Sequence, residues 1–242
     1  VNALGANTTG ANNTAVGALA GDAITTGSES VALGSNSLSA ATTSSKNTAL
    51  GAYALRNDTL GSSSVAVGHQ ALNAVGANAG VAVTTGTNNT LIGGLAGDAI
   101  TTANNCIAIG TNALGGNVLA DRSIAIGNNA LLTHNVGSSA DTYNVAIGHQ
   151  SQEKTTTGTL NTSVGGYALY ANTTASNNTA IGYSALIANT TGAGNTAIGK
   201  SALESNTTGA DNIAIGRDSM TAATTADQTI SIGHIAGTAL TT

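Results

Sequence analysis

The sequence contains no proline, tryptophan or phenylalanine, and charged residues make up only 7% of its 242 residues. The core of an ordinary globular domain draws on large aromatic side chains, and here only tyrosine supplies them. The absence of proline favours long ladders of backbone hydrogen bonds, which proline would interrupt. Hydrophobic residues still form 41% of the chain and recur at regular positions, so the composition does not indicate disorder.

Other scarcities exclude classes of function. A single cysteine, Cys106, excludes an internal disulfide and a metal site built from several cysteines. The net charge is −5 and no stretch is basic, so nucleic-acid binding has no electrostatic support. No apolar run approaches the roughly 20 residues needed to cross a bilayer. We therefore expect no nucleic-acid partner and no membrane span in this segment.

Glycine, in contrast, is abundant and recurs with a fixed period. A glycine closes each segment of the type Asn-Thr-Ala-Ile-Gly, and ten of the twelve intervals between these glycines equal the 17-residue step from Gly17 to Gly34. Such a period is the signature of a repeat architecture. We call these residues the motif glycines and count positions in each unit from them: Gly17, Gly34, Gly51, Gly68, Gly93, Gly110, Gly127, Gly148, Gly165, Gly182, Gly199, Gly216 and Gly233.

Two intervals are longer than the period. The interval from Gly68 to Gly93 exceeds it by eight positions, and the interval from Gly127 to Gly148 exceeds it by four. Each is therefore one unit plus an insertion, and we place the insertions near residues 76–83 and 133–140. Both chain ends fall inside a unit, so we expect residues 1–242 to form a single repeat domain, an excerpt of a longer fibre.

Each unit carries a strand pattern before its motif glycine. The residue one before the glycine is always Val, Ile or Leu, and the residue three before it is always Thr, Val or Ile. A small residue, usually Ala, stands between them, and this alternation is typical of a short β-strand. Later in the unit, clusters such as Asn-Thr-Thr-Gly at residues 189–192 predict a turn.

These features predict an all-β fold, a parallel β-solenoid of about 13 coils. A 17-residue unit has room for two short strands and two turns, whereas helical repeats commonly need more than about 30 residues. Successive coils would share backbone hydrogen bonds at roughly 4.8 Å per coil. Asn stands four before the motif glycine in eight units, and stacking would turn these side chains into a ladder of amides.

The two faces of the strand indicate an oligomer. We expect the aliphatic residues one and three before the glycine to fill the core, together with a Leu column four after it, and Ala to face outward. A strand that is apolar on both faces usually has something packed on both sides, and small residues permit close approach of another backbone. We therefore expect a homotrimer. The alternative is a wider monomeric solenoid in which Ala fills a tight corner.

Several segments resemble the head repeats of YadA-like trimeric autotransporter adhesins: Ser30–Gly34, Asn144–Gly148 and Asn195–Gly199. The longer unit from Asn178 to Gly192 is also similar to repeats of phage tail-fibre-like proteins. The likeness covers essentially the whole chain and implies left-handed parallel β-rolls in a tight homotrimer, with the Val and Ile positions inward. The unit of the adhesin heads is somewhat shorter than the unit of this chain, which favours the fibre-like relatives.

Few residues point to catalysis or metal binding. Asp and Glu are scattered and no pair of nucleophile and base can be proposed, so we expect no enzyme, no catalytic residue and no cofactor. His69, His149 and His234 each follow a motif glycine directly, but several coils apart, too far to share an ion within one chain. A ring of three His around a threefold axis is the remaining metal arrangement. The same position also holds Lys200, which favours a variable, exposed position, and we assign no metal site.

Contact with a receptor is expected at positions that vary between units and at the two insertions, because other coil residues are occupied with stacking. The alternative is that the insertions are merely tolerated. We assign candidate contacts for a cell-surface receptor or glycan to six residues at or near such positions: Tyr53, Tyr143, Tyr167, Tyr183, His69 and His149.

The sequence thus favours a structural or adhesive fibre segment that attaches to cells or surfaces, extracellular, at a cell surface or on a virion. Repeated Thr-Thr pairs, such as those at 25–26 and 207–208, raise an ice-binding β-solenoid as an alternative. Adjacent residues on a strand point to opposite faces, however, which argues against a single Thr surface. A passive spacer of an extracellular filament is the third hypothesis.

Overall fold

The computed structural model describes residues 2–71, 86–138, 140–238 and 240. These residues form an all-β parallel β-solenoid of about 12 turns with the predicted 17-residue repeat, and no helix occurs in them. The chain divides into two compact units. Unit 1 comprises Val1–Arg122 and Gly137–Ala140, and unit 2 comprises Ser123–Val136 and Asp141–Thr242. The predicted insertion at residues 76–83 lies outside the described residues.

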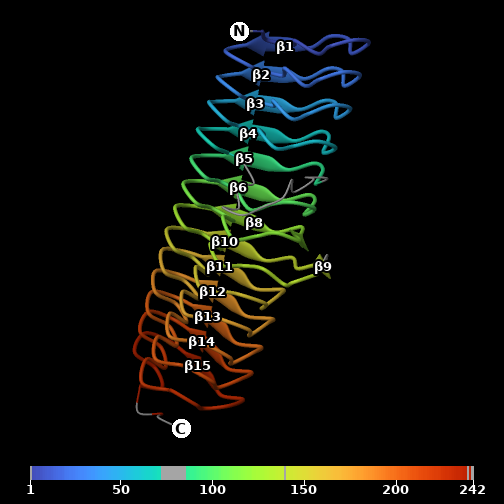
Figure 1. Ribbon diagram of the computed structural model, residues 1–242. Coiled ribbons are helices and arrows are strands. Elements are labelled where there is room, and N and C mark those ends of the chain that lie inside the picture. Colours follow the sequence, from blue (N-terminus) through green and yellow to red (C-terminus); the bar gives the residue numbers. More distant parts are fainter. Residues whose placement is uncertain (1, 72–85, 139, 239, 241–242) are drawn as a thin grey trace. The chain divides into compact units, whose positions relative to one another are not determined.

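Unit 1 contributes six three-residue strands that pair in parallel, in chain order (Figure 1). They are β1 (Thr14–Val16), β2 (Val31–Leu33), β3 (Thr48–Leu50), β4 (Val65–Val67), β5 (Thr90–Ile92) and β6 (Ile107–Ile109). Thr48 of β3 pairs with Val65 of β4, one period along the chain. Val65 in turn pairs with Thr90 across the first of the two longer intervals. The extra residues therefore leave the register of the strands intact.

Unit 2 contributes seven such strands, again parallel and in chain order. They are β8 (Ile124–Ile126), β10 (Val145–Ile147), β11 (Thr162–Val164), β12 (Thr179–Ile181), β13 (Thr196–Ile198), β14 (Ile213–Ile215) and β15 (Ile230–Ile232). Val145 pairs with Ile124 across the second longer interval, so this insertion also preserves the register. Two further strands have two residues each, β7 (Ala120–Asp121) and β9 (Ala140–Asp141), and stand outside these rows.

Apart from the coils that carry β7 and β9, each described coil has one strand, and the expectation of two strands per unit is wrong. The rest of the coil turns repeatedly, because residues five before, two after and four after the motif glycine adopt the left-handed conformation. In the coil that contains β11 these residues are Leu160, Tyr167 and Leu169, with φ of 59°, 59° and 53°. A left-handed residue interrupts an extended segment, so the return path of the coil is a series of turns.

The motif glycine is required by backbone conformation and by stacking. Gly165 has φ of +138°, a region that is nearly closed to residues with a side chain. A Cβ atom there would also lie 2.5 Å from the carbonyl oxygen of Gly182 in the next coil. Gly166 has neither restriction, since the atom nearest to a Cβ placed there is a ring carbon of Tyr183 at 3.5 Å. The period of the sequence therefore reflects the close approach of successive backbones at one point of the coil.

The core lies on the alanine side of the strand, and the predicted orientation of the two faces is wrong. Ala180 and Ala197, at the centres of β12 and β13, are fully buried. Their neighbours Ile181 and Ile198 are 39% and 36% exposed. In most coils the interior holds a small residue from the strand and one larger side chain, such as Leu186, from the opposite wall, whereas in β5 the strand itself supplies the buried Leu91, against Gly97. Because side chains alternate along a strand, the β-branched residues then face outward.

The larger core side chain comes from one of two positions in the turn. Most described coils place Leu or Met four after the motif glycine, as predicted, and these side chains are fully buried: Leu38, Leu55, Leu114, Leu131, Leu169, Leu186, Leu203 and Met220. Where this position is Gly21 or Gly97, an Ile three residues later fills the space. A Cβ atom at Gly97 would lie 2.9 Å from Cδ1 of Ile100. The core thus keeps its volume while the residue that supplies it changes.

The Asn residues four before the motif glycine form the predicted ladder, mostly through bonds between amides and backbone. The backbone N–H of Asn178 donates to Oδ1 of Asn161 at 3.0 Å, and that of Asn195 donates to Oδ1 of Asn178 at 2.9 Å. Nδ2 of Asn195 donates to the carbonyl of Gly209 at 2.7 Å. These buried amides satisfy backbone groups of neighbouring coils and so hold the stack in register.

Candidate functional site

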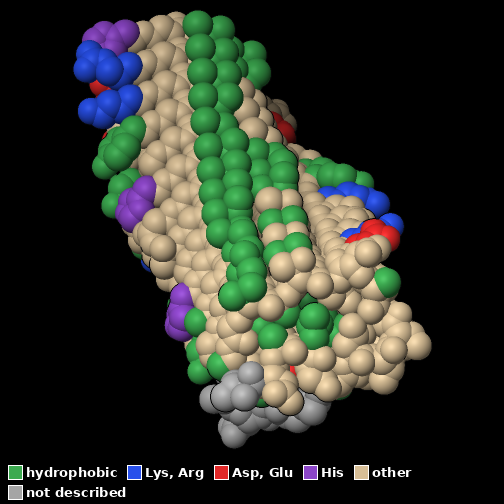
Figure 2. All heavy atoms as spheres, turned by 90° about the horizontal axis from the view of Figure 1, so that it is seen from above, with side chains coloured by type: hydrophobic (Ala, Val, Ile, Leu, Met, Phe, Trp, Pro, Cys, Tyr) green, Lys and Arg blue, Asp and Glu red, His purple; other side chains and the backbone are tan. Residues whose placement is uncertain are grey.

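The outward residues of the strands form an apolar surface within each unit, which we call the aliphatic stripe. It consists of the residues one and three before each motif glycine, and none of them is charged. In unit 1 these are Thr14, Val16, Val31, Leu33, Thr48, Leu50, Val65, Val67, Thr90, Ile92, Ile107 and Ile109. In unit 2 they are Ile124, Ile126, Val145, Ile147, Thr162, Val164, Thr179, Ile181, Thr196, Ile198, Ile213, Ile215, Ile230 and Ile232. Figure 2 shows hydrophobic side chains in rows on one face.

The aliphatic stripe is only partly covered in the single chain. Leu33 and Ile92 of unit 1 are 37% and 39% exposed, much like Ile181 and Ile198 of unit 2. Contiguous exposed apolar surface on a protein marks a place of interaction. The sequence analysis assigned these residues to the core, because an alternating pattern does not say which face is inside. The small size of the central residue was the available signal, since a narrow coil has room for little more than Ala.

Five of the six predicted receptor contacts lie in two aromatic groups. In unit 2 the rings of His149 and Tyr167 meet edge to face with their centres 5.3 Å apart, and the rings of Tyr167 and Tyr183 do so at 5.8 Å. In unit 1 the rings of Tyr53 and His69 meet in the same manner at 6.0 Å. The variable positions next to the motif glycine therefore come together on the surface of each unit.

Three neighbours of these rings were missed by the sequence analysis. The ring of Tyr170 lies 6.0 Å from that of Tyr167, and Nζ of Lys154 lies 4.7 Å from the centre of the Tyr170 ring. In unit 1 the guanidinium carbon of Arg56 lies 5.3 Å from the centre of the Tyr53 ring. All three stand five or six residues after a motif glycine. Aligning every position of the unit, instead of the two beside the glycine, would have made them candidates.

The sixth candidate, Tyr143, lies apart from these groups. It adopts the left-handed conformation, is 49% exposed, and its hydroxyl donates to Oδ2 of Asp141 at 3.1 Å. The second insertion is described except for residue 139, and His134 within it is buried. His134 therefore does not belong to an exposed recognition loop.

Two ionisable side chains are buried at the same position of the coil, seven after the motif glycine. Asp58 accepts a hydrogen bond from the backbone N–H of Gly61 at 2.7 Å and another from Nδ2 of Asn47 at 3.2 Å. Burial outweighs the hydrogen bonds and raises the pKa of Asp58 to about 7. Burial lowers the pKa of His134 to about 4, so its imidazole is neutral around pH 7.

The remaining titratable residues of the described part of the chain lie apart from these two positions. Among the described residues, no three of His, Cys, Asp and Glu are placed to hold a metal ion. His234 lies against Arg217, whose Nε is 3.6 Å from Oδ2 of Asp218. Cys106 is buried, with its Sγ 3.4 Å from the carbonyl oxygen of Ala120, and occupies the Asn position of the ladder, where its backbone N–H donates to Oδ1 of Asn89 at 2.9 Å.

The Thr-Thr pairs form hydrogen bonds between successive coils. Oγ1 of Thr190 donates to the carbonyl of Thr207 at 3.0 Å, and Oγ1 of Thr207 donates to the carbonyl of Thr224 at 3.1 Å. Oγ1 of Thr25 does the same to Thr42 at 3.0 Å in unit 1. The first hydroxyl of such a pair is thus engaged with the next coil and is not free to present a regular outward row.

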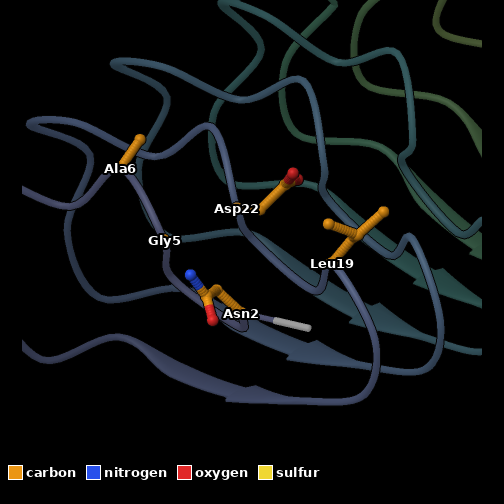
Figure 3. A pocket seen from close by; sticks show the side chains of 5 residues that line it. All are labelled: Asn2, Gly5, Ala6, Leu19 and Asp22. Atoms are coloured by element: carbon orange, nitrogen blue, oxygen red, sulfur yellow. The ribbon is translucent and has the colours of Figure 1, made fainter.

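A hollow in the first coil of unit 1 is lined by Asn2, Gly5, Ala6, Leu19 and Asp22 (Figure 3). Of the described residues that line it, Asp22 alone has an ionisable side chain, and these residues supply no pair of groups for acid–base or nucleophilic chemistry. We assign no reaction to it.

No known protein family, curated protein or solved structure matches the chain. None of the described residues belongs to a helix long and apolar enough to cross a membrane.

Proposed function

We propose that this chain is a segment of a homotrimeric extracellular fibre, at a cell surface or on a virion, with a structural and adhesive role instead of a catalytic one. The observation that carries the proposal is the aliphatic stripe. It presents uncharged β-branched and leucine side chains on coil after coil, several of them more than a third exposed in the single chain. Apolar surface of this extent favours burial against a partner.

A second copy of the chain is the partner that fits the stripe best. Coils stack at roughly 4.8 Å, so only a surface with the same spacing meets every coil in an equivalent way. A parallel copy has that spacing, and its own stripe is equally apolar. A threefold axis parallel to the stack would bring three stripes together around a shared core. The choice of three copies over two follows the resemblance to the adhesin heads.

Molar mass by light scattering tests the proposal. We expect the unchanged chain to have three times the mass of one chain, and the double variant Ile181→Lys/Ile198→Lys to be monomeric, because it places charges in an apolar interface. Thr191→Lys/Thr208→Lys is the matched control: it adds the same two charges in exposed turns of the same unit and should leave the trimer intact. A monodisperse monomer of the unchanged chain would overturn the proposal.

Ice binding is a second candidate, and one observation favours it. Thr162, Thr179 and Thr196 stand on successive strands three before the motif glycine, on the outward face beside Val and Ile. The outward Thr row is therefore on the strand and not in the Thr-Thr turns. A measurement of thermal hysteresis separates the two functions. Ice binding would be supported if the monomeric chain shows hysteresis and the variant Thr179→Lys does not. A trimer without hysteresis would support the fibre.

A further inference from the structure

The aromatic group of unit 2 is a surface feature that we call the aromatic corner. It consists of His149, Tyr167, Tyr170 and Tyr183, with Lys154 beside them. Tyr167 is central, and the centres of the other three rings lie 5.3 to 6.0 Å from its own. All three ring contacts are edge to face, so the edge of one ring packs against the face of the other in each pair.

The fold does not depend on these rings. The core of this region is built from buried Ala and Leu, and none of the four rings is part of it. Tyr183 is 54% exposed. Another coil of unit 2 places Asn129 at the position of Tyr167 and Asn128 at that of Tyr183. A large aromatic residue where a small polar one serves the coil equally well indicates a role in binding.

A glycine without a backbone role accompanies the rings. Gly166 follows its motif glycine directly, and its φ lies outside the region reserved for glycine. A Cβ atom there would meet the ring of Tyr183 at 3.5 Å, an ordinary contact distance. Glycine at this position therefore leaves the surface between His149 and Tyr183 without a side chain. An incoming group can reach the rings there.

Unit 1 brings together the same residue types in a different order along the coils, since Tyr53 lies one coil before His69 whereas Tyr167 lies one coil after His149. Tyr53 and His69 form the edge-to-face pair, Arg56 stands over the tyrosine ring, and Gly94 follows His69 in the next coil as Gly166 follows His149. A Cβ atom at Gly94 would come no closer than 3.9 Å to the carbonyl oxygen of His69. Both units thus place His, Tyr, Gly and a cation close together on the surface, although in different arrangements.

Both cations are available to a ligand. Lys154 and Arg56 are exposed, and their recorded contacts in the described part of the chain are those with the tyrosine rings. Neither forms an ion pair with the Asp and Glu residues that the structure describes. An exposed cation held beside an aromatic face can accept an anionic group without first breaking a salt bridge.

We propose that the aromatic corner and its counterpart in unit 1 bind an acidic saccharide. The apolar C–H face of a sugar ring would pack on tyrosine, its hydroxyls would hydrogen-bond to His149 and the Tyr hydroxyls, and its carboxylate would pair with Lys154 or Arg56. The corner spans three coils, on the order of 10 Å along the stack, which suits one or two sugar rings. Each corner lies within one chain, so the inference does not rest on the trimer.

A glycan array with matched neutral and uronic-acid oligosaccharides, probed with the labelled full chain, tests the inference. We expect binding to uronic-acid members at least tenfold tighter than to their neutral counterparts. The triple variant Tyr53→Asn/Tyr167→Asn/Tyr183→Asn should lose at least tenfold in affinity. Asn occupies the equivalent positions of other coils, so these substitutions keep the fold. Lys154→Ala with Arg56→Ala should abolish the preference for acidic members, because it removes both cations.

Leu160→Asn is the matched control, since it removes a large exposed side chain outside both groups at a position where other coils carry Asn. It should bind as the unchanged chain does. Absence of binding to every saccharide, or equal binding by the triple variant, would overturn the inference, and equal binding of neutral members would overturn the acidic assignment. Light scattering of the triple variant should match the unchanged chain; a lower mass would instead make the corner part of a protein interface and also contradict the inference.

Discussion

At the scale of single residues, Asp58 and His134 occupy the position where four described coils place an amide. Asn172, Asn189 and Asn206 illustrate the usual arrangement: Nδ2 of Asn206 donates to Oδ1 of Asn189 at 2.9 Å and to the carbonyl of Gly209 at 3.0 Å. An amide satisfies this buried position without charge. An ionisable side chain in its place links the stability of the coil to pH.

Asp58 is expected to destabilise unit 1 as the pH rises. Its pKa is raised from 3.8 to about 7, so the folded chain holds a proton between these values that the unfolded chain releases. The free energy of unfolding should therefore fall between about pH 4 and pH 7 and stay low above pH 7. Asp58→Asn should match the unchanged chain near pH 3 and be more stable at pH 8, by roughly 4 kcal/mol at about 1.4 kcal/mol per pKa unit. Urea unfolding at both pH values measures this; equal stability at pH 8 would contradict it.

His134 is expected to change the free energy of unfolding with pH in the opposite direction, and His134→Asn tests this. The pKa of His134 is lowered to about 4, so its stabilising neutral form is fully present above about pH 6.5 and is lost as the pH falls toward 4. The asparagine variant should remove this loss on the acid side and leave the alkaline side unchanged, which urea unfolding at pH 4 and pH 8 measures. Both substitutions use a residue that the repeat itself places at this position.

At the scale of the coil, the large side chain that fills the core can come from the position four after the motif glycine or from the position seven after it. Gly21 with Ile24 fills the space that Leu38 with Ala41 fills one coil later. Leu38 is already in the left-handed conformation, with φ of 50°, and glycine adopts this conformation without strain. The two solutions should therefore be interchangeable within one coil, provided that both residues change together.

The pair Leu38 and Ala41 is expected to show strong coupling. Leu38→Gly should lower the free energy of unfolding by about 2–5 kcal/mol because it leaves a cavity. Ala41→Ile should lower it by about 1–3 kcal/mol because it overfills the core. The double variant should recover more than about 1 kcal/mol relative to the sum of the single effects. A double-mutant cycle by chemical denaturation gives the coupling energy, and strict additivity would refute the exchange.

The same scale shows where sequence reasoning succeeded and where it failed. The 17-residue period, the position of the strand and the Leu column were predictable, because the motif glycine and the alternation mark them directly. The inward face was not, because it depends on the width of the coil. That width is set by left-handed residues such as Leu55 and Lys46, whose residue types rarely adopt this conformation. The rings beside Tyr53 and Tyr167 could be predicted as candidates because they stand at positions that vary between units. Arg56 and Lys154 could not, because the sequence does not show how far their side chains reach toward these rings.

At the scale of the whole molecule, the stack depends on register more than on length. Val65 pairs with Thr90, and Val145 pairs with Ile124, although both intervals exceed the period. Extra residues are therefore accepted where they leave the coil and rejoin it in register. In a repeat protein each coil contacts mainly its neighbours, and stability is close to a sum over coils and their interfaces. Removal of one complete unit should then lower the free energy of unfolding only by the contribution of that unit.

Deletion of residues 200–216 tests this dependence, because it removes one complete unit and joins Gly199 to Arg217. β13 would then pair with β15 in place of β14, with Ala197 beside Ser231 in the core. We expect circular dichroism per residue and cooperative thermal unfolding close to those of the full chain. Deletion of residues 200–217, one residue more, is the control, because it leaves the coil one residue too short, and a missing residue cannot leave the coil as an insertion does. It shifts every later position by one, which turns inward side chains outward and separates the motif glycines from their contacts. That variant should unfold far more readily; equal stability of the two deletions would show that register does not hold this stack together.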